Sequence, residues 1–132
     1  MFLREWNDLP NFMKCKEVRP YYEGLKRRRF QLILKRLFDL LMAIVMITFF
    51  SIPMIIVAII IKMDSQGPIF FRQERVTIYG EIFKIHKFRT MVNGAEKLGS
   101  GVTVKVDPRV TKVGRVLRKY RIDEIPQLID II

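Results

Sequence analysis

The segment LLMAIVMITFFSIPMIIVAIII, residues Leu40–Ile61, decides how this chain is organised. Its 22 residues carry no charge. As a helix that rises about 1.5 Å per residue, the segment would be about 33 Å long, which is enough for the hydrocarbon core of a bilayer, about 30 Å thick. It begins too far into the chain, and is too long, to be a secretory signal peptide. The sequence therefore predicts a membrane-associated protein.

Pro53 lies near the middle of this segment and predicts a sharp bend, because proline removes a helical hydrogen bond and clashes with the preceding turn. Ser51 can satisfy a carbonyl that the bend frees. Neither arm, Leu40–Ile52 or Pro53–Ile61, is long enough to span the bilayer. Both flanks are basic, which is typical of cytoplasmic loops. We expect residues 30–62 to form an interfacial and re-entrant helix, in which Leu40–Ile61 is a re-entrant hairpin with both flanks in the cytoplasm; a kinked full span is the alternative.

Composition limits what the remaining residues can do. The chain has 132 residues with 24 Lys and Arg against 13 Asp and Glu, so its formal net charge is +11. Half of the residues are hydrophobic, which argues against disorder, and the length suits one domain. One cysteine, Cys15, and one histidine, His86, exclude an internal disulfide and a zinc site built from these residue types. His86 lies in an alternating run and is expected to be an ordinary strand residue.

Residues 1–29 form an N-terminal extension without clear periodicity, whose Arg27–Arg29 run is expected to contact anionic lipid. Helical spacing of apolar residues then predicts an interfacial helix that leads into the membrane segment. Within it, Lys35 and Arg36 lie within one turn of Asp39. These two cations either neutralise the carboxylate or form a positive site for a lipid phosphate.

Residues 63–132 are expected to form a small cytoplasmic domain that is mostly helical and contains a short strand pair, so the fold class is α+β. β-Branched and aromatic residues in 69–71 and Glu81–Phe88 predict the strands, with a turn at Thr77–Gly80. The three Gly of 94–106 predict a loop after them.

Two helices are expected after this loop. Asp107 and Pro108 predict the N-cap and first residue of a basic amphipathic helix, which is either a lipid-facing surface or a phosphate-binding wall. In the second helix Asp123 suits an N-cap and Glu124 follows it. The helix dipole and nearby cations favour ionised carboxylates there. An ionised carboxylate among cations can attack phosphorus; a capping Asp with a first-turn Glu is the simpler alternative.

Several segments, in order over roughly residues 30–132, together resemble the bacterial sugar transferase family, the monotopic polyprenyl-phosphate phosphoglycosyl transferases. They are KRLFD at 35–39, the proline at 53, GPIFFRQERV at 67–76, FKIHKFRTM at 83–91, DPRVTKVGR at 107–115 and DEIPQL at 123–128. The family's proline often follows a serine directly, whereas Ile52 separates the two here. The chain ends at Ile132 without the Gly-Asp-Met-Ser-type and Gly-Pro-Arg-Pro-type segments that follow in the family, so a C-terminally incomplete, truncated sequence is expected.

The resemblance implies that a sugar-1-phosphate passes from a UDP-sugar to a polyprenyl phosphate, in polysaccharide assembly at the cytoplasmic face of the bacterial inner membrane. It implies that Asp123 is the nucleophile of a phosphosugar-aspartyl intermediate, with Glu124 as its catalytic neighbour. Mg2+ is the metal that it implies, with Asp123 as a candidate ligand.

Cations are expected to neutralise the phosphates of the substrates. The candidates are Lys35, Arg36, Arg72, Arg89, Arg115 and Arg118. No nucleic-acid partner is expected, because no nucleic-acid-binding motif is present. The alternatives are an inactive truncated copy and a membrane-anchored basic adaptor that binds anionic lipid.

Overall fold

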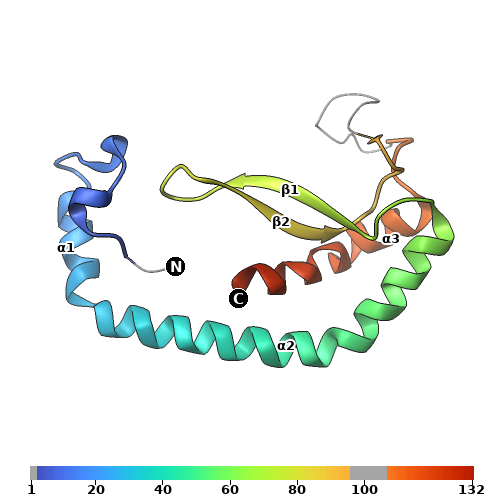
Figure 1. Ribbon diagram of the computed structural model, residues 1–132, viewed down its shortest axis with the longest axis horizontal. Coiled ribbons are helices and arrows are strands. Elements are labelled where there is room, and N and C mark those ends of the chain that lie inside the picture. Colours follow the sequence, from blue (N-terminus) through green and yellow to red (C-terminus); the bar gives the residue numbers. More distant parts are fainter. Residues whose placement is uncertain (1–2, 96–106) are drawn as a thin grey trace.

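The computed structural model describes residues 3–95 and 107–132. A long helix runs along one side of the molecule, two shorter helices lie against it, and the last of these separates it from much of a β-hairpin (Figure 1). The elements in chain order are η1 (Trp6–Asp8), η2 (Asn11–Met13), α1 (Arg19–Arg27), α2 (Arg29–Asp64), β1 (Phe70–Val76), β2 (Ile82–Phe88), α3 (Lys112–Lys119) and η4 (Ile122–Ile131), where η marks a 3-10 helix. The predicted mixture of helices and one strand pair is confirmed.

Helix α2 is one continuous helix of 36 residues with Pro53 inside it. It bends between its cyan and its green portions, and does not fold back on itself (Figure 1). The Ser51 hydroxyl donates to the carbonyl of Thr48 at 2.7 Å, so a polar group binds the backbone just before the proline. Proline removes a single ladder hydrogen bond, which kinks a helix without ending it. Among residues 3–95 and 107–132 there is thus one helix long and apolar enough to cross a membrane, and the re-entrant hairpin stays a prediction.

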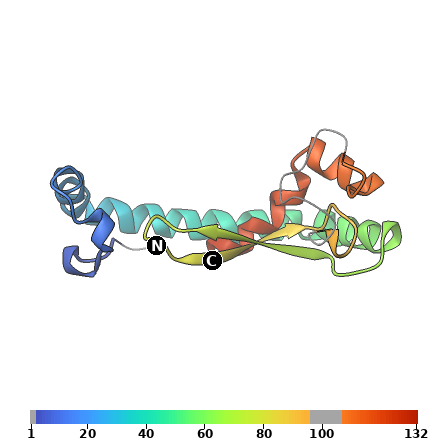
Figure 2. The ribbon, with the colours of Figure 1, turned by 90° about the horizontal axis from the view of Figure 1, so that it is seen from above.

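The two strands form an antiparallel hairpin that runs alongside α2 (Figure 2). Phe70 pairs with Phe88 at its base, and Val76 pairs with Ile82 next to the turn. The turn is the predicted one: the N–H of Thr77 donates to the carbonyl of Glu81 at 2.8 Å. Helix η4 contacts both β2 and α2. It therefore carries the Asp-Glu pair into the space beneath the hairpin.

The main core lies where the C-terminal part of α2 meets the base of the hairpin and α3. Ile61, Phe88 and Leu117 are buried there. Gly114 allows α3 to approach closely, since a Cβ at this position would lie 2.0 Å from the carbonyl oxygen of Thr90. These contacts place the residues that follow β2 against α3.

A second, smaller core lies at the other end of the hairpin. Leu9 and Tyr22 from the N-terminal extension pack on Tyr79 in the turn. The extension, which shows no clear periodicity in sequence, is therefore folded into α1 and two 3-10 turns. Its order comes from aromatic packing on a distant turn, which leaves no periodic pattern in the sequence.

Two predicted helix starts are wrong. Helix α3 begins at Lys112, with Thr111 as its N-cap, and the Thr111 hydroxyl accepts from the N–H of Gly114 at 2.9 Å. The Asp107 carboxylate instead accepts from the N–H of Arg109 at 3.0 Å, a local turn that competes with helix capping. Helix η4 has Arg121 as its N-cap, so Asp123 lies inside the helix. The predicted loop 94–106 lies outside the described residues after Ala95.

Candidate active site

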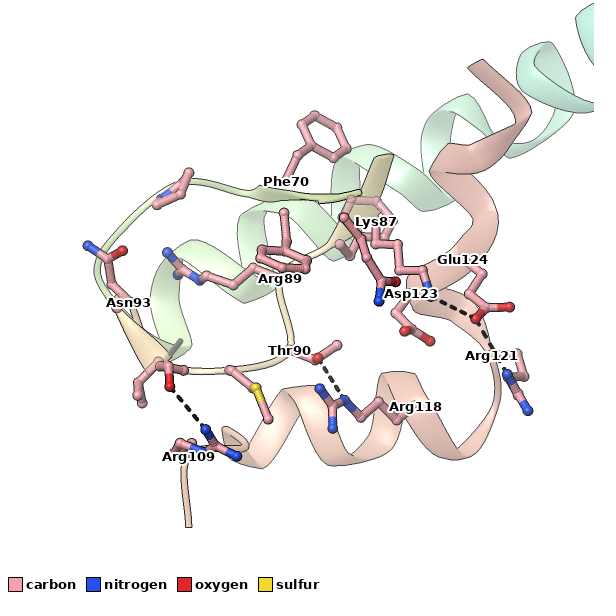
Figure 3. Close-up of a pocket in the computed structure, with 18 of the residues that line it drawn as sticks. Phe70, Lys87, Arg89, Thr90, Asn93, Arg109, Arg118, Arg121, Asp123 and Glu124 are labelled. Carbon is pink, nitrogen blue, oxygen red and sulfur yellow. Dashed lines mark hydrogen bonds and ion pairs between the residues drawn. The ribbon is translucent and has the colours of Figure 1, made fainter. Parts of the chain in front are cut away.

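A cavity of about 630 Å3 opens between the hairpin, the residues after β2, α3 and η4 (Figure 3). Cationic side chains outnumber acidic ones in its lining. They are Arg75, Lys87, Arg89, Arg109, Arg118 and Arg121. Two carboxylates, Asp123 and Glu124, face them from η4. A cavity with this charge balance suits a ligand that carries phosphate groups.

Asp123 is 9% exposed, and its Oδ1 atom is buried with no hydrogen-bond partner among the described residues. Burial, and next the neighbouring charge of Glu124, raise the pKa of the Asp123 carboxyl above its usual value. Lys87 and Arg118 act in the opposite direction but do not prevail. Lys87 and Arg118 thus favour the ionised form, as the sequence predicted for nearby cations, but the sequence did not show the larger effect of burial. Desolvation penalises a buried charge more than nearby cations stabilise it.

Glu124 has the opposite environment. Its Oε1 atom accepts from the Lys87 ammonium at 3.1 Å and lies 3.4 Å from Nη1 of Arg121. The Lys87 hydrogen bond is the main reason that the pKa of Glu124 is lowered. Adjacent carboxyls with pKa values displaced in opposite directions are typical of sites in which the two groups have different roles.

Arg118 and Arg89 are the two predicted phosphate-binding arginines that line the cavity. Nε of Arg118 donates to the Thr90 hydroxyl at 2.8 Å, which holds its guanidinium on the cavity wall (Figure 3). Arg89 is buried and donates to the carbonyls of Ser65 at 2.6 Å and Gln66 at 3.1 Å. Arg89 therefore ties the turn that ends α2 to the cavity.

The other four predicted cations lie outside this cavity. Arg72 follows a cavity-lining residue, Phe71, on β1, and successive side chains of a strand point to opposite faces. Arg115 is exposed on α3. Lys35 pairs with Asp39 on the N-terminal half of α2, beside Arg36. This pairing matches the interpretation of Lys35 as a neutralising partner.

Sequence reasoning missed four cations that line the cavity, Arg75, Lys87, Arg109 and Arg121. Lys87 had a readable signal, because it lies near the end of a predicted strand, two residues before the candidate Arg89, and alternation along an extended chain gives such residues the same face. Arg121 had none, because its position depends on how α3 and η4 meet. His86, expected to be an ordinary strand residue, does not line the cavity. Its backbone N–H donates to the Asp130 carboxylate of η4 at 2.7 Å.

Within residues 3–95 and 107–132, no group of three or more His, Cys, Asp or Glu side chains could hold a metal ion. The carboxylates of Asp123 and Glu124 are nevertheless adjacent, and an oxygen of Asp123 is unpartnered within the described part of the chain. Mg2+ commonly binds one or two carboxylates, with water and substrate phosphates completing its shell. The residues present fit that kind of site and do not fit an all-protein cage.

Comparison with known proteins adds a family and several relatives. Residues 30–132 match the family model described as bacterial sugar transferase. A UDP-N-acetylgalactosamine-undecaprenyl-phosphate N-acetylgalactosaminephosphotransferase of Aeromonas hydrophila is 42% identical over 99 residues, which cover 75% of this chain and 23% of the relative. A UDP-glucose:undecaprenyl-phosphate glucose-1-phosphate transferase of Escherichia coli strain K12 is 39% identical, over 98% of this chain and 26% of the relative.

A shorter relative extends the comparison. A putative undecaprenyl-phosphate N-acetylgalactosaminyl 1-phosphate transferase of Bacillus subtilis strain 168 is 41% identical, over 76% of this chain and 56% of the relative. The matched part of the chain thus spans between about a quarter and just over half of the length of these three relatives.

Proposed function

The chain belongs to the bacterial sugar transferase family, and on that premise we propose that it transfers a sugar-1-phosphate from a UDP-sugar to a polyprenyl phosphate. The observation that carries the proposal is the buried Asp123 carboxylate, unpartnered at Oδ1 within the described residues and set in a cation-lined cavity. A basic adaptor that only binds anionic lipid would need the cations, but it leaves this buried carboxylate unexplained.

In the proposed first step, a carboxylate oxygen of Asp123 attacks the phosphorus that carries the sugar. The bond from that phosphorus to the bridging oxygen breaks, and UMP leaves with the bridging oxygen and its electron pair. A phosphate oxygen of the polyprenyl phosphate then attacks the same phosphorus, and the Asp123 carboxylate leaves. Two displacements at one site allow a water-soluble donor and a lipid acceptor to react in turn.

The surroundings of Asp123 support this role. A raised pKa makes the ionised carboxylate more basic, and hence a better nucleophile, than an ordinary surface carboxylate. Lys87 and Arg118 lie close enough to influence its charge, and they would also face the phosphate oxygens of a substrate at this carboxylate. Burial of Asp123 limits access of water to an acyl phosphate formed on it.

Membrane attachment is proposed through α2. Its apolar side chains are mostly exposed, and its C-terminal turn is bonded to the cavity through Arg89. The cavity therefore lies where α2 ends, which would bring a lipid phosphate at the membrane surface close to Asp123. A re-entrant insertion, with both flanks in the cytoplasm, agrees with the basic residues at either end.

Mg2+ is proposed as the metal, held by Asp123 or Glu124 together with phosphate oxygens of the donor. When bound it would withdraw charge from the diphosphate. Lys87 and the arginines supply the fixed positive charge of the site, and they hold and orient the donor's phosphates around Asp123.

The test is UMP release from a panel of UDP-sugars by the full-length protein in detergent, with polyprenyl phosphate and Mg2+ present. We expect Asp123→Asn to lower the rate at least about a thousandfold, as loss of a nucleophile does. Asp8→Ala, at an exposed carboxylate of η1, should stay within about twofold of wild type. With donor alone, the mass of the wild-type protein should rise by one phosphosugar.

Protein stability separates lost chemistry from lost folding. Because the pKa of Asp123 is raised, the folded state holds its charge less favourably than the unfolded state at neutral pH. Asp123→Asn should therefore melt at the same or a higher temperature than wild type. Turnover retained in this variant would disprove the nucleophile assignment. Continuous UMP release, beyond one UMP per protein, that does not depend on polyprenyl phosphate with any UDP-sugar would disprove the transfer.

A further inference from the structure

Arg121 joins α3 to η4 with a left-handed backbone, at φ 58° and ψ 21°. Across the described ranges 3–95 and 107–132 it is the single residue other than glycine with a positive φ. Many helices end with a left-handed residue, and glycine is usual there because it has no Cβ to meet the backbone. The end of α3 explains this conformation. It does not explain why arginine occupies the position.

The side chain of Arg121 lies at the mouth of the cavity. It is 78% exposed, and Nη1 lies 3.4 Å from Oε1 of Glu124. The same oxygen accepts from Lys87 at 3.1 Å (Figure 3). Glu124 therefore keeps a closer and less exposed partner if Arg121 moves away.

Other arginines of the cavity are held more firmly. Nη2 of Arg109 lies 2.7 Å from the Asp107 carboxylate, and Nε of Arg118 lies 2.8 Å from the Thr90 hydroxyl. Both contacts are shorter than that of Arg121 and involve less exposed side chains. An ion pair as exposed as Arg121 with Glu124 contributes little to stability. An incoming group with more negative charge than Glu124 would therefore take its place as the partner of Arg121.

We propose that Arg121 binds the diphosphate of the UDP-sugar at the mouth of the cavity, exchanging its contact with Glu124 for phosphate oxygens as the donor enters. This rests on the proposed function. The guanidinium can donate two parallel hydrogen bonds to a phosphate. Its exposure to solvent favours the water-soluble donor over the lipid acceptor, which reaches the site from the membrane. The side chain of the left-handed residue that ends α3 is thus the donor-binding arm of the site.

The test compares Arg121→Gly with Arg121→Lys in the full-length protein. Glycine adopts the left-handed conformation freely, so Arg121→Gly removes the guanidinium and should not lower the melting temperature. We expect the KM for the UDP-sugar to rise about tenfold, equivalent to about 1.4 kcal/mol. The kcat and the KM for polyprenyl phosphate should change by less than about twofold. Arg121→Lys should recover part of the donor affinity, because it keeps the charge and loses the paired donors.

Lys112→Ala is the matched control, since Lys112 is an exposed cation of α3 that does not line the cavity. It should leave both KM values unchanged. Calorimetry with UDP-sugar, with Asp123→Asn added to both proteins so that no phosphosugar can be transferred, measures donor binding independently of turnover. Weaker binding in Arg121→Gly, without turnover in wild type, would support the arm and overturn the proposed function. Equal donor binding and equal KM in wild type and Arg121→Gly would overturn the arm alone.

Discussion

The two ends of the β1–β2 hairpin are held by different kinds of contact. At the turn, Tyr79 packs with Leu9 and Tyr22, and the Arg4 guanidinium lies 4.6 Å from the centre of its ring. At the base, Asp123 Oδ1 and Arg89 Nε are buried without hydrogen-bond partners among the described residues, and Arg121 is left-handed. Unpartnered and strained groups cluster at functional sites. The contacts of Tyr79 at the turn end, in contrast, are packed and partnered.

The turn end depends on residues outside the family match. The matched region is 30–132, and Leu9 and Tyr22 precede it. An isolated two-stranded hairpin is marginally stable at best, so both of its ends need packing partners. In this chain the N-terminal extension packs the turn, and α2 with α3 packs the base. The comparison predicts that changes at the base affect stability and transfer together, whereas changes at the turn affect stability alone.

The largest change in stability is expected from Gly114→Ala at the base. The new Cβ would lie 2.0 Å from the Thr90 carbonyl oxygen, so α3 must move away from the residues after β2. Overpacking of this kind typically costs about 1–3 kcal/mol, and we expect the upper end because the obstacle is backbone. Transfer should fall as well, since Thr90 holds Arg118. Thermal unfolding and UMP release measure the two effects.

Gly24→Ala is the matched glycine control. Gly24 lies inside α1, and nothing lies within 4 Å of the position that its Cβ would take. Alanine should stabilise this helix by about 0.5–1 kcal/mol. If both alanine variants unfold alike, the close approach of α3 is not a determinant of stability.

The two buried carboxylates near the base should respond to pH in opposite ways. Hydrogen bonds from the side chain and backbone of Arg109 lower the pKa of Asp107 to about 2. The folded pKa lies below the unfolded value, so Asp107 contributes stability that is present above about pH 4 and is lost as the pH falls toward 2. The pKa of Asp123 is raised in the folded state, so its contribution to the stability of the fold declines as the pH rises above the ordinary pKa of an aspartate.

Melting temperatures between pH 2 and pH 7, measured without divalent metal, distinguish these two carboxylates. Asp107→Asn should be less stable than wild type at pH 7 and approach it near pH 2. Asp123→Asn should melt at a higher temperature than wild type at pH 7, and this difference should disappear in acid. Parallel curves for wild type and both variants would contradict the assigned environments.

The smallest effect is expected at the hairpin turn, from Tyr79→Phe. This change keeps the ring that packs against Leu9 and removes the hydroxyl, which accepts from the N–H of Arg4 at 3.4 Å. A neutral hydrogen bond contributes about 0.5–1.5 kcal/mol, and this long one should lie at the lower end. Amide exchange at Arg4 should speed up, and UMP release should not change. A drop in transfer would show that the two ends of the hairpin are coupled.

Local sequence patterns predicted most of the elements. The uncharged run Leu40–Ile61 predicted the long apolar helix, and the turn at Thr77–Gly80 followed from its composition. Helix starts were less well predicted, because Asp107 and Thr111 are both plausible caps and only the finished packing selects one. The fold of residues 3–29 was missed because its partner is a turn about seventy residues away in sequence.

The sequence by itself determined the long apolar helix, the strand pair and the Asp-Glu pair beside a basic helix. These features depend on runs of apolar residues and on short-range spacing, which a linear pattern records. Only the tertiary structure decided that burial raises the pKa of Asp123, that Lys87 and Arg121 share Glu124, and that Arg89 is bonded to the end of α2. Desolvation and contacts between distant residues exist only once α2, the hairpin and η4 have packed together.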